Sequence, residues 1–209
     1  MPRRPRPNIS AAEKAFLLED SVIYEIKFAL GVPEYVANDY CIWESINFTR
    51  IAHARVLYDF FTQSISDTTE GLDDLVSEDF SFGPMGDLLK DEVKRINKGL
   101  MHISASRAKR SLEEKQWQND LLILVHKWSV EFIDHILAGK MDTGITIKRD
   151  DWENLATILK SGHELRMRHL RYLNDNGQEG GIEFLGPGRK LASGYSELTE
   201  LKLTKKLTG

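Results

Sequence analysis

Hydrophobic residues recur along most of this chain at intervals of three or four, the spacing that places them on one face of an α-helix. The first such segment covers residues 11–30, and Gly31 and Pro33 then supply a stop signal. A second segment covers about residues 34–63 and contains no glycine or proline. Because it is dense in large hydrophobic residues on more than one side, we expect it to be the most buried helix.

Three more helical segments follow. The third begins near residue 85 and repeats its hydrophobic residues in alternating steps of four and three: Leu89, Val93, Ile96, Leu100 and Ile103. The fourth covers residues 113–138 and is closed by Gly139, and the fifth covers about residues 150–173. The pattern predicts an all-α fold, a bundle of about five main helices with antiparallel neighbours where the loops are short.

The two ends of the chain lack this pattern. Residues 1–10 contain three prolines and three arginines, which predicts a disordered basic arm. Residues 175–209 are rich in glycine and carry one weak helical patch, so we expect a mostly disordered tail. One helical domain over residues 11–174 is long enough to bury a single core.

The overall charge gives no sign of nucleic-acid binding, because the formal net charge is -4 and such domains are usually basic. The single cysteine, Cys41, cannot form an internal disulfide, which suits a reducing compartment. The chain has no hydrophobic run of the ~18–20 residues that span a bilayer, and its first residues lack the apolar segment of a signal peptide. We therefore expect a cytoplasmic protein with no membrane partner.

One stretch departs from this acidic composition. Residues 94–110 include six lysines and arginines and no acidic residue, so they should attract phosphate. Within the stretch, Arg95 and His102 are seven residues apart and project well away from the hydrophobic stripe of the third helix. They therefore face solvent or a second surface such as a partner subunit. An arginine can grip a phosphate through two N–H groups, and a histidine can move a proton near neutral pH.

Arg95 and His102 also fit a known motif, an arginine followed after four to six residues by a histidine. In this respect the chain resembles ribonuclease-type HEPN domains, which are small all-helical bundles. The resemblance implies metal-independent RNA cleavage at a site assembled from two copies of the motif across a homodimer interface. It implies that Arg95 holds the scissile phosphate, that His102 acts on the 2'-hydroxyl or leaving group, and that Asn97 is an accessory polar residue. The family commonly places its polar residue directly after the arginine, where this chain has Ile96.

The chain is also similar to an uncharacterised bacterial helical family that has three blocks in the same order: HARVLYDFF (residues 53–61), DDLVSEDF (residues 73–80) and INKGLMHISASR (residues 96–107). The blocks cover roughly the middle third of the chain and imply no established activity. In this alignment Asn97, His102 and Arg107 match better than Arg95 does. Arg107 is therefore the alternative to Arg95 in the phosphate role, and Lys98 is a further phosphate-binding candidate.

A second polar group lies in the second helical segment. Arg50 and His53 project from the centre of its hydrophobic stripe, where a charged group needs a partner. Asp79 and Asp74, in the acidic loop that follows, are the nearest candidates in sequence. A buried network of this kind is more often structural than catalytic. Support of a functional site is the alternative.

The remaining histidines form no HExxH or cysteine-containing ligand set, and the chain has no GxxxxGK[ST], GxGxxG or GxSxG motif. We therefore expect no metal ion and no cofactor. The leading hypothesis is a HEPN-like protein that binds RNA or a nucleotide phosphate, with RNA cleavage as an open question. The alternative is a non-catalytic helical interaction or regulatory protein that docks a protein partner on residues 94–110.

Overall fold

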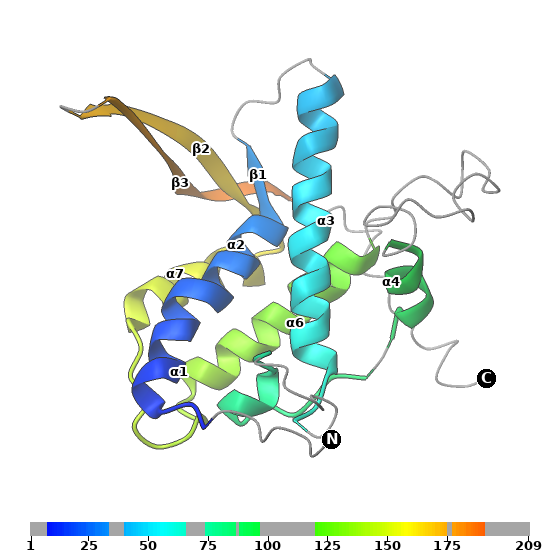
Figure 1. The fold of residues 1–209 in the computed structure, drawn as a ribbon, viewed down its shortest axis with the longest axis vertical. Helices are drawn as coiled ribbons and strands as arrows, with labels where there is room; N and C mark the ends of the chain where they lie inside the picture. The colour runs from blue at the N-terminus through cyan, green and yellow to red at the C-terminus, as the bar shows by residue number, and fades with distance from the viewer. Residues whose placement is uncertain are drawn as a thin grey trace, which may run out of the picture.

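The computed structural model describes residues 8–33, 40–65, 74–86, 88–96, 120–174 and 177–190. Most of these residues are helical, and a small three-stranded sheet lies at one end of the helical body (Figure 1). Among the described helices, none is long and apolar enough to cross a membrane.

The N-terminal helical run confirms the first predicted helix. It consists of α1 (Ala11–Leu17), a π-helical turn η1 (Leu18–Val22) and α2 (Ile23–Leu30). Ser10 caps its start, because the Glu13 N–H donates to the Ser10 hydroxyl at 3.3 Å and the Ser10 N–H donates to the Glu13 carboxylate at 2.8 Å. Ser10 therefore belongs to the helical domain rather than to the basic arm. The run ends at Gly31, where the chain becomes extended and enters β1 (Gly31–Pro33).

The core lies among four helices, α2, α3 (Tyr40–Thr62), α6 (Asp120–Leu137) and α7 (Arg149–Lys160). Helix α3 packs against α2 and against α6, and α7 packs against α6. Four phenylalanine rings meet there with the centroids of contacting rings 5.1–6.1 Å apart: Phe60, Phe61, Phe80 and Phe132. Phe80 comes from a 3₁₀ turn, η2 (Ser77–Phe80), so the segment after α3 folds back into the core.

The third and fourth predicted helices are described in part. Helix α4 (Lys90–Ile96) is the described beginning of the third helix, and its Val93 and Ile96 are buried as the stripe predicts. Helix α6 ends two residues before Gly139, which adopts φ +68° and closes the helix as expected. Residues 97–119, which hold the rest of the third predicted helix and the start of the fourth, lie outside the described residues.

The prediction of a mostly helical fold is confirmed, but the fold is not entirely α-helical, because the chain after α7 forms strands. Gly162 adopts φ +75° just after the helix, and the chain beyond it pairs as β2 (His163–Asn174) and β3 (Gly177–Lys190). This antiparallel hairpin replaces the end of the fifth predicted helix and the start of the tail predicted from residue 175. Strand β1 joins β2 in parallel, so the sheet order is β1-β2-β3. Residues 191–209 lie outside the described residues.

One glycine of the supposed tail has a packing role in the sheet. A Cβ added at Gly188 would meet Val32 Cγ2 at 2.8 Å and the Glu164 carbonyl oxygen at 3.0 Å. A glycine at this position lets the neighbouring strands approach closely. At this position the glycine is therefore explained by close packing in the sheet.

Candidate functional site

Of the predicted catalytic residues, the structure describes Arg95. The other two predicted catalytic residues lie outside the described residues: His102 and Asn97. The same holds for the two phosphate candidates, Lys98 and Arg107. Their predicted roles therefore stay predictions.

Arg95 is held by Glu92, one turn earlier on α4. Its Nε donates to Glu92 Oε2 at 2.8 Å, and its Nη2 donates to Oε1 of the same carboxylate. This pair occupies the Nε/Nη2 edge of the guanidinium, which is one of the edges that can bind a phosphate through two N–H groups. A phosphate bound through this edge of Arg95 would have to displace Glu92.

Arg50 has an acidic partner far away in the sequence. Its Nη2 donates to Glu164 on β2, its Nε donates to the Ala29 carbonyl oxygen at 3.3 Å, and both charged side chains are less than 5% exposed. Asp79, the partner suggested by sequence proximity, accepts instead from the Val76 N–H at 2.9 Å at the start of η2. These contacts of Arg50 join α3 to the sheet and to the end of α2, which is a structural role.

His53 pairs with Glu25 on α2. Its Nδ1 lies 2.8 Å from Glu25 Oε2, and the rings of Tyr24 and Phe28 flank the imidazole with centroids 5.5 and 5.2 Å away. When the imidazole is neutral, this contact places its proton on Nδ1 and leaves Nε2 as an acceptor. The pair fixes the orientation of both side chains and places the Glu25 carboxylate between α2 and α3.

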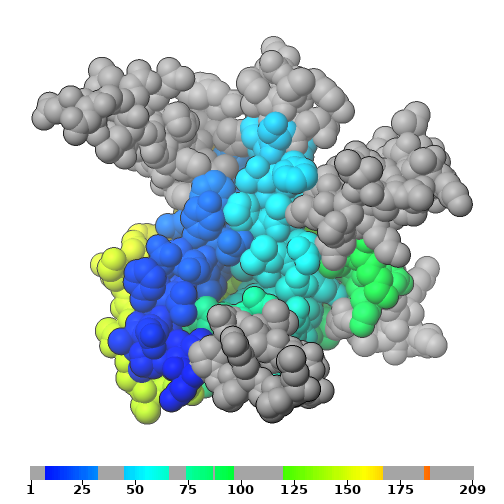
Figure 2. Space-filling view, viewed as in Figure 1, coloured from blue at the N-terminus to red at the C-terminus, as the bar shows by residue number. Residues whose placement is uncertain are grey.

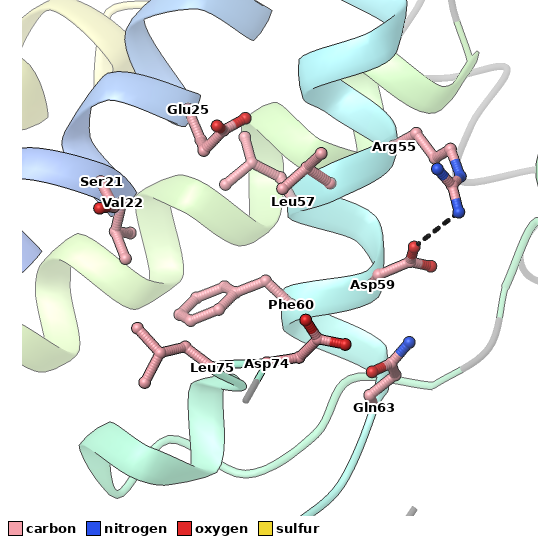
Figure 3. Close-up of a pocket in the computed structure, with 11 residues that line it drawn as sticks. Ser21, Val22, Glu25, Arg55, Leu57, Asp59, Phe60, Gln63, Asp74 and Leu75 are labelled. Carbon is pink, nitrogen blue, oxygen red and sulfur yellow. Dashed lines mark ion pairs between the residues drawn. The ribbon is translucent and has the colours of Figure 1, made fainter. Parts of the chain in front are cut away.

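Glu25 also lines a pocket of about 400 Å³ between these two helices. Helices α2 and α3 lie side by side on the face shown in Figure 2, and the close-up in Figure 3 shows the lining side chains. The hydrophobic lining consists of Val22, Val56, Leu57, Phe60 and Leu75. The polar lining consists of Ser21, Glu25, Arg55, Asp59, Gln63 and Asp74.

The pocket brings together two of the sequence blocks that carry the family resemblance. Arg55 and Asp59 belong to HARVLYDFF, and Asp74 belongs to DDLVSEDF. Asp59 was not among the predicted site residues, because the i, i+4 spacing of Arg55 and Asp59 is that of an ordinary surface pair on a helix. The signal that could have found it is the position of an acidic residue between the bulky Leu57 and Phe60.

Asp59 has an unusual electrostatic environment. Its Oδ2 lies 3.3 Å from Arg55 Nη2. Burial raises the pKa of the Asp59 carboxyl, Arg55 lowers it, and the neighbouring Asp74 carboxylate raises it further. The Arg55 Nε is buried and has no hydrogen-bond partner among the described residues. The Arg55–Asp59 pair is therefore only partly satisfied.

Within the described part of the chain, no group of three or more His, Cys, Asp or Glu side chains could hold a metal ion. The carboxylates of the pocket, Glu25, Asp59 and Asp74, therefore do not form such a group. No family model, curated protein or solved structure matches this chain. Function is therefore inferred from the residues themselves.

Proposed function

We propose that the protein is a cytoplasmic, HEPN-like protein that binds RNA or a nucleotide phosphate through residues 94–110, as a homodimer. The supporting observation is the way α4 begins this basic run. Val93 and Ile96 are buried in the core, whereas the Lys94 side chain is 59% exposed. Lys94, at the start of the run, can therefore contact a polyanion while Val93 and Ile96 keep their contacts in the core.

Within this run we assign the phosphate contact to Arg107 in preference to Arg95, because Glu92 engages Arg95. Lys98 supplies a second cation. His102 then transfers the proton of the 2'-hydroxyl or of the leaving group, a task that suits a side chain with a pKa near neutrality. The RNA itself supplies the nucleophile, so this proposal needs no metal ion.

The test is RNA cleavage in EDTA. Purified full-length protein is incubated with mixed RNA, and we expect His102→Ala to lower the cleavage rate by about 100-fold or more. The matched control is His163→Ala, which removes a histidine that lies outside the basic run in sequence and contacts Ser161. Far-UV circular dichroism checks that both variants keep their helicity. Cleavage that His102→Ala leaves unchanged would contradict the assigned role.

Measurements of RNA affinity distinguish the roles of Arg95 and Arg107. We expect Arg107→Gln to weaken binding and to reduce the salt dependence by about one phosphate contact, whereas Arg95→Gln has little effect. Filter binding or fluorescence anisotropy over a range of salt concentrations measures both quantities. The opposite order would return the phosphate role to Arg95.

The engagement of Arg95 by Glu92 also supports a second candidate function, that of a non-catalytic interaction or regulatory protein. In that case residues 94–110 dock an acidic surface of a protein partner. A protein that forms a stable complex through this run, and that neither binds nor cuts RNA, would have this second function.

A further inference from the structure

Helix α3 has hydrophobic side chains on its outer side as well as on the sides that face the core. Leu57, Tyr58 and Phe61 belong to the core and are less than 5% exposed. On the outer side, Phe48 is 44% exposed and Val56 is 46% exposed. Exposed hydrophobic side chains that gather on one face of a helix mark a surface to which another molecule can bind.

The exposed residues of α3 form a row along the helix. Phe48, Ala52 and Val56 are four residues apart, so each follows the last on the same face. Ala52 lies between the two larger residues and is partly exposed itself. Figure 2 shows α3 at the surface of the molecule, beside α2. We call this row the α3 ridge, because rows of this spacing are the ridges through which helices pack on one another.

The α3 ridge is complementary to a second copy of itself. A large residue lies at each end of the ridge, and the smallest lies in the middle. When two α3 helices pack antiparallel about a twofold axis at Ala52, Phe48 of each copy lies beside the partner's Val56. Ala52 meets the partner's Ala52, and its small side chain lets the two helices approach closely. A twofold interface requires a surface that fits itself in this manner.

The polar residues of α3 next to the ridge permit the same contact. On one side of the ridge, Arg55 Nη2 lies 3.3 Å from Asp59 Oδ2, so these two residues add no net charge (Figure 3). On the other side, Ser45 and Thr49 are uncharged. Two copies can therefore meet along α3 without the like-charge repulsion that a formal net charge of -4 would otherwise cause. A nucleic acid would instead need an excess of cations, which the ridge does not offer.

We propose that the α3 ridge is the surface through which two copies of this chain pair, with their α3 helices antiparallel and Ala52 on the twofold axis. The inference rests on the homodimer of the proposed function and names its interface. It does not depend on whether the dimer binds or cuts RNA, because the ridge lies outside residues 94–110.

Disulfide trapping in the full-length chain tests the position of the axis. The single native cysteine is removed first, so every variant also carries Cys41→Ser. Under mild oxidation, Ala52→Cys should form linked dimers on a non-reducing gel, because residues on a close twofold axis reach the separation that a disulfide needs. Lys127→Cys, at an exposed position of α6, is the matched control and should stay unlinked.

A mixture of two variants tests the antiparallel direction. Phe48→Cys and Val56→Cys should link to each other when mixed, and each should link less to itself. Failure of Ala52→Cys to link, or equal linking of Lys127→Cys, would overturn the proposed interface.

A charge at the centre of the ridge should separate the two copies. Ala52→Glu would bury two carboxylates against each other, so we expect it to weaken dimerisation by at least about 10-fold in sedimentation equilibrium. Phe16→Glu is the matched control, because Phe16 lies on α1 outside the ridge and is 64% exposed. Far-UV circular dichroism checks the fold. If Ala52→Glu does not fold, Val56→Ser at its exposed position decides the result.

RNA cleavage by the same variants distinguishes a failure of this interface from a failure of the proposed function. If Ala52→Glu remains a dimer that cuts RNA as the wild type does, the α3 ridge is not the interface and the proposed function stands. If Ala52→Cys links as expected but the wild type neither binds nor cuts RNA, the interface stands and the proposed function fails. A wild type that is monomeric at all concentrations would overturn the interface outright.

Discussion

Single buried ionisable residues determine how this protein responds to pH. His126 on α6 is the clearest case, because burial lowers the pKa of its imidazole despite the opposing effect of the nearby Glu164 carboxylate. Its Nε2 is buried and has no hydrogen-bond partner among the described residues. The folded protein therefore holds His126 neutral at pH values where an unfolded chain would protonate it.

We predict that His126 makes the fold less stable in mild acid. An unfolded histidine takes up a proton near pH 6.5, and the folded state resists that proton, so stability falls as the pH drops below that value. His126→Gln should therefore show a smaller fall in Tm between pH 7.5 and pH 5.5 than the wild type.

The comparison needs a histidine control. His163→Gln changes a residue whose Nδ1 contacts Ser161 Oγ at 2.7 Å in an exposed position. It should keep the wild-type fall in Tm. An unchanged pH dependence in His126→Gln would show that another group is responsible.

At the scale of elements, the sheet is joined to the helices by a buried ion pair. Arg50 on α3 and Glu164 on β2 are both less than 5% exposed, and Arg50 also donates to the carbonyl of Ala29 near the end of α2. Removing one partner leaves the other charge buried and unpaired, which is more costly than removing both.

We predict that Glu164→Gln destabilises the protein by about 3–5 kcal/mol. The double variant Arg50→Met/Glu164→Gln should lose less stability than the two single losses added together, since it leaves no unpaired charge. Glu153→Gln, which breaks the exposed Arg149–Glu153 pair, is the control and should change stability by less than about 1 kcal/mol. Urea unfolding measures the wild type, both single variants, the double variant and the control, and a strictly additive double variant would contradict the coupling.

The elements that could be predicted from the sequence are those with local signals. Residues 11–30 show helical periodicity followed by Gly31 and Pro33, and the helix ends there. The parallel pairing of β1 with β2 and the partner of Arg50 could not be predicted in this way. Strand β1 pairs with residues 165–167, and Glu164 is 114 residues from Arg50, so neither contact leaves a local pattern. Asp59 was missed for the opposite reason, because its local spacing has a common structural explanation.

At the scale of the whole molecule, the charge is distributed unevenly along the chain. The pocket between α2 and α3 is acidic, whereas residues 94–110 contain six cations and no acid. In a chain with a formal net charge of -4, the RNA binding that we propose should therefore depend on this local run and be sensitive to salt.

We predict a homodimer of twice the chain mass of 23.9 kDa. The resemblance to HEPN domains implies a site shared between two copies, so the RNA-cutting form should be the dimer. Light scattering after gel filtration measures the mass, and dilution to a monomer should remove cleavage. Full activity of a monomer would contradict the shared site.

The parallel pairing of β1 with β2 has a consequence for the order of folding. Residues 31–33 leave the ribosome long before residues 165–167, with which they pair. Until that late segment is available, α3 carries Arg50 in a position that is buried in the finished protein but has no Glu164 to receive it. The early helices can form from their own local signals, yet they cannot close their core at that end during synthesis. Chains interrupted before residue 163 should therefore be incompletely folded and exposed to proteolysis, although they contain every described helix.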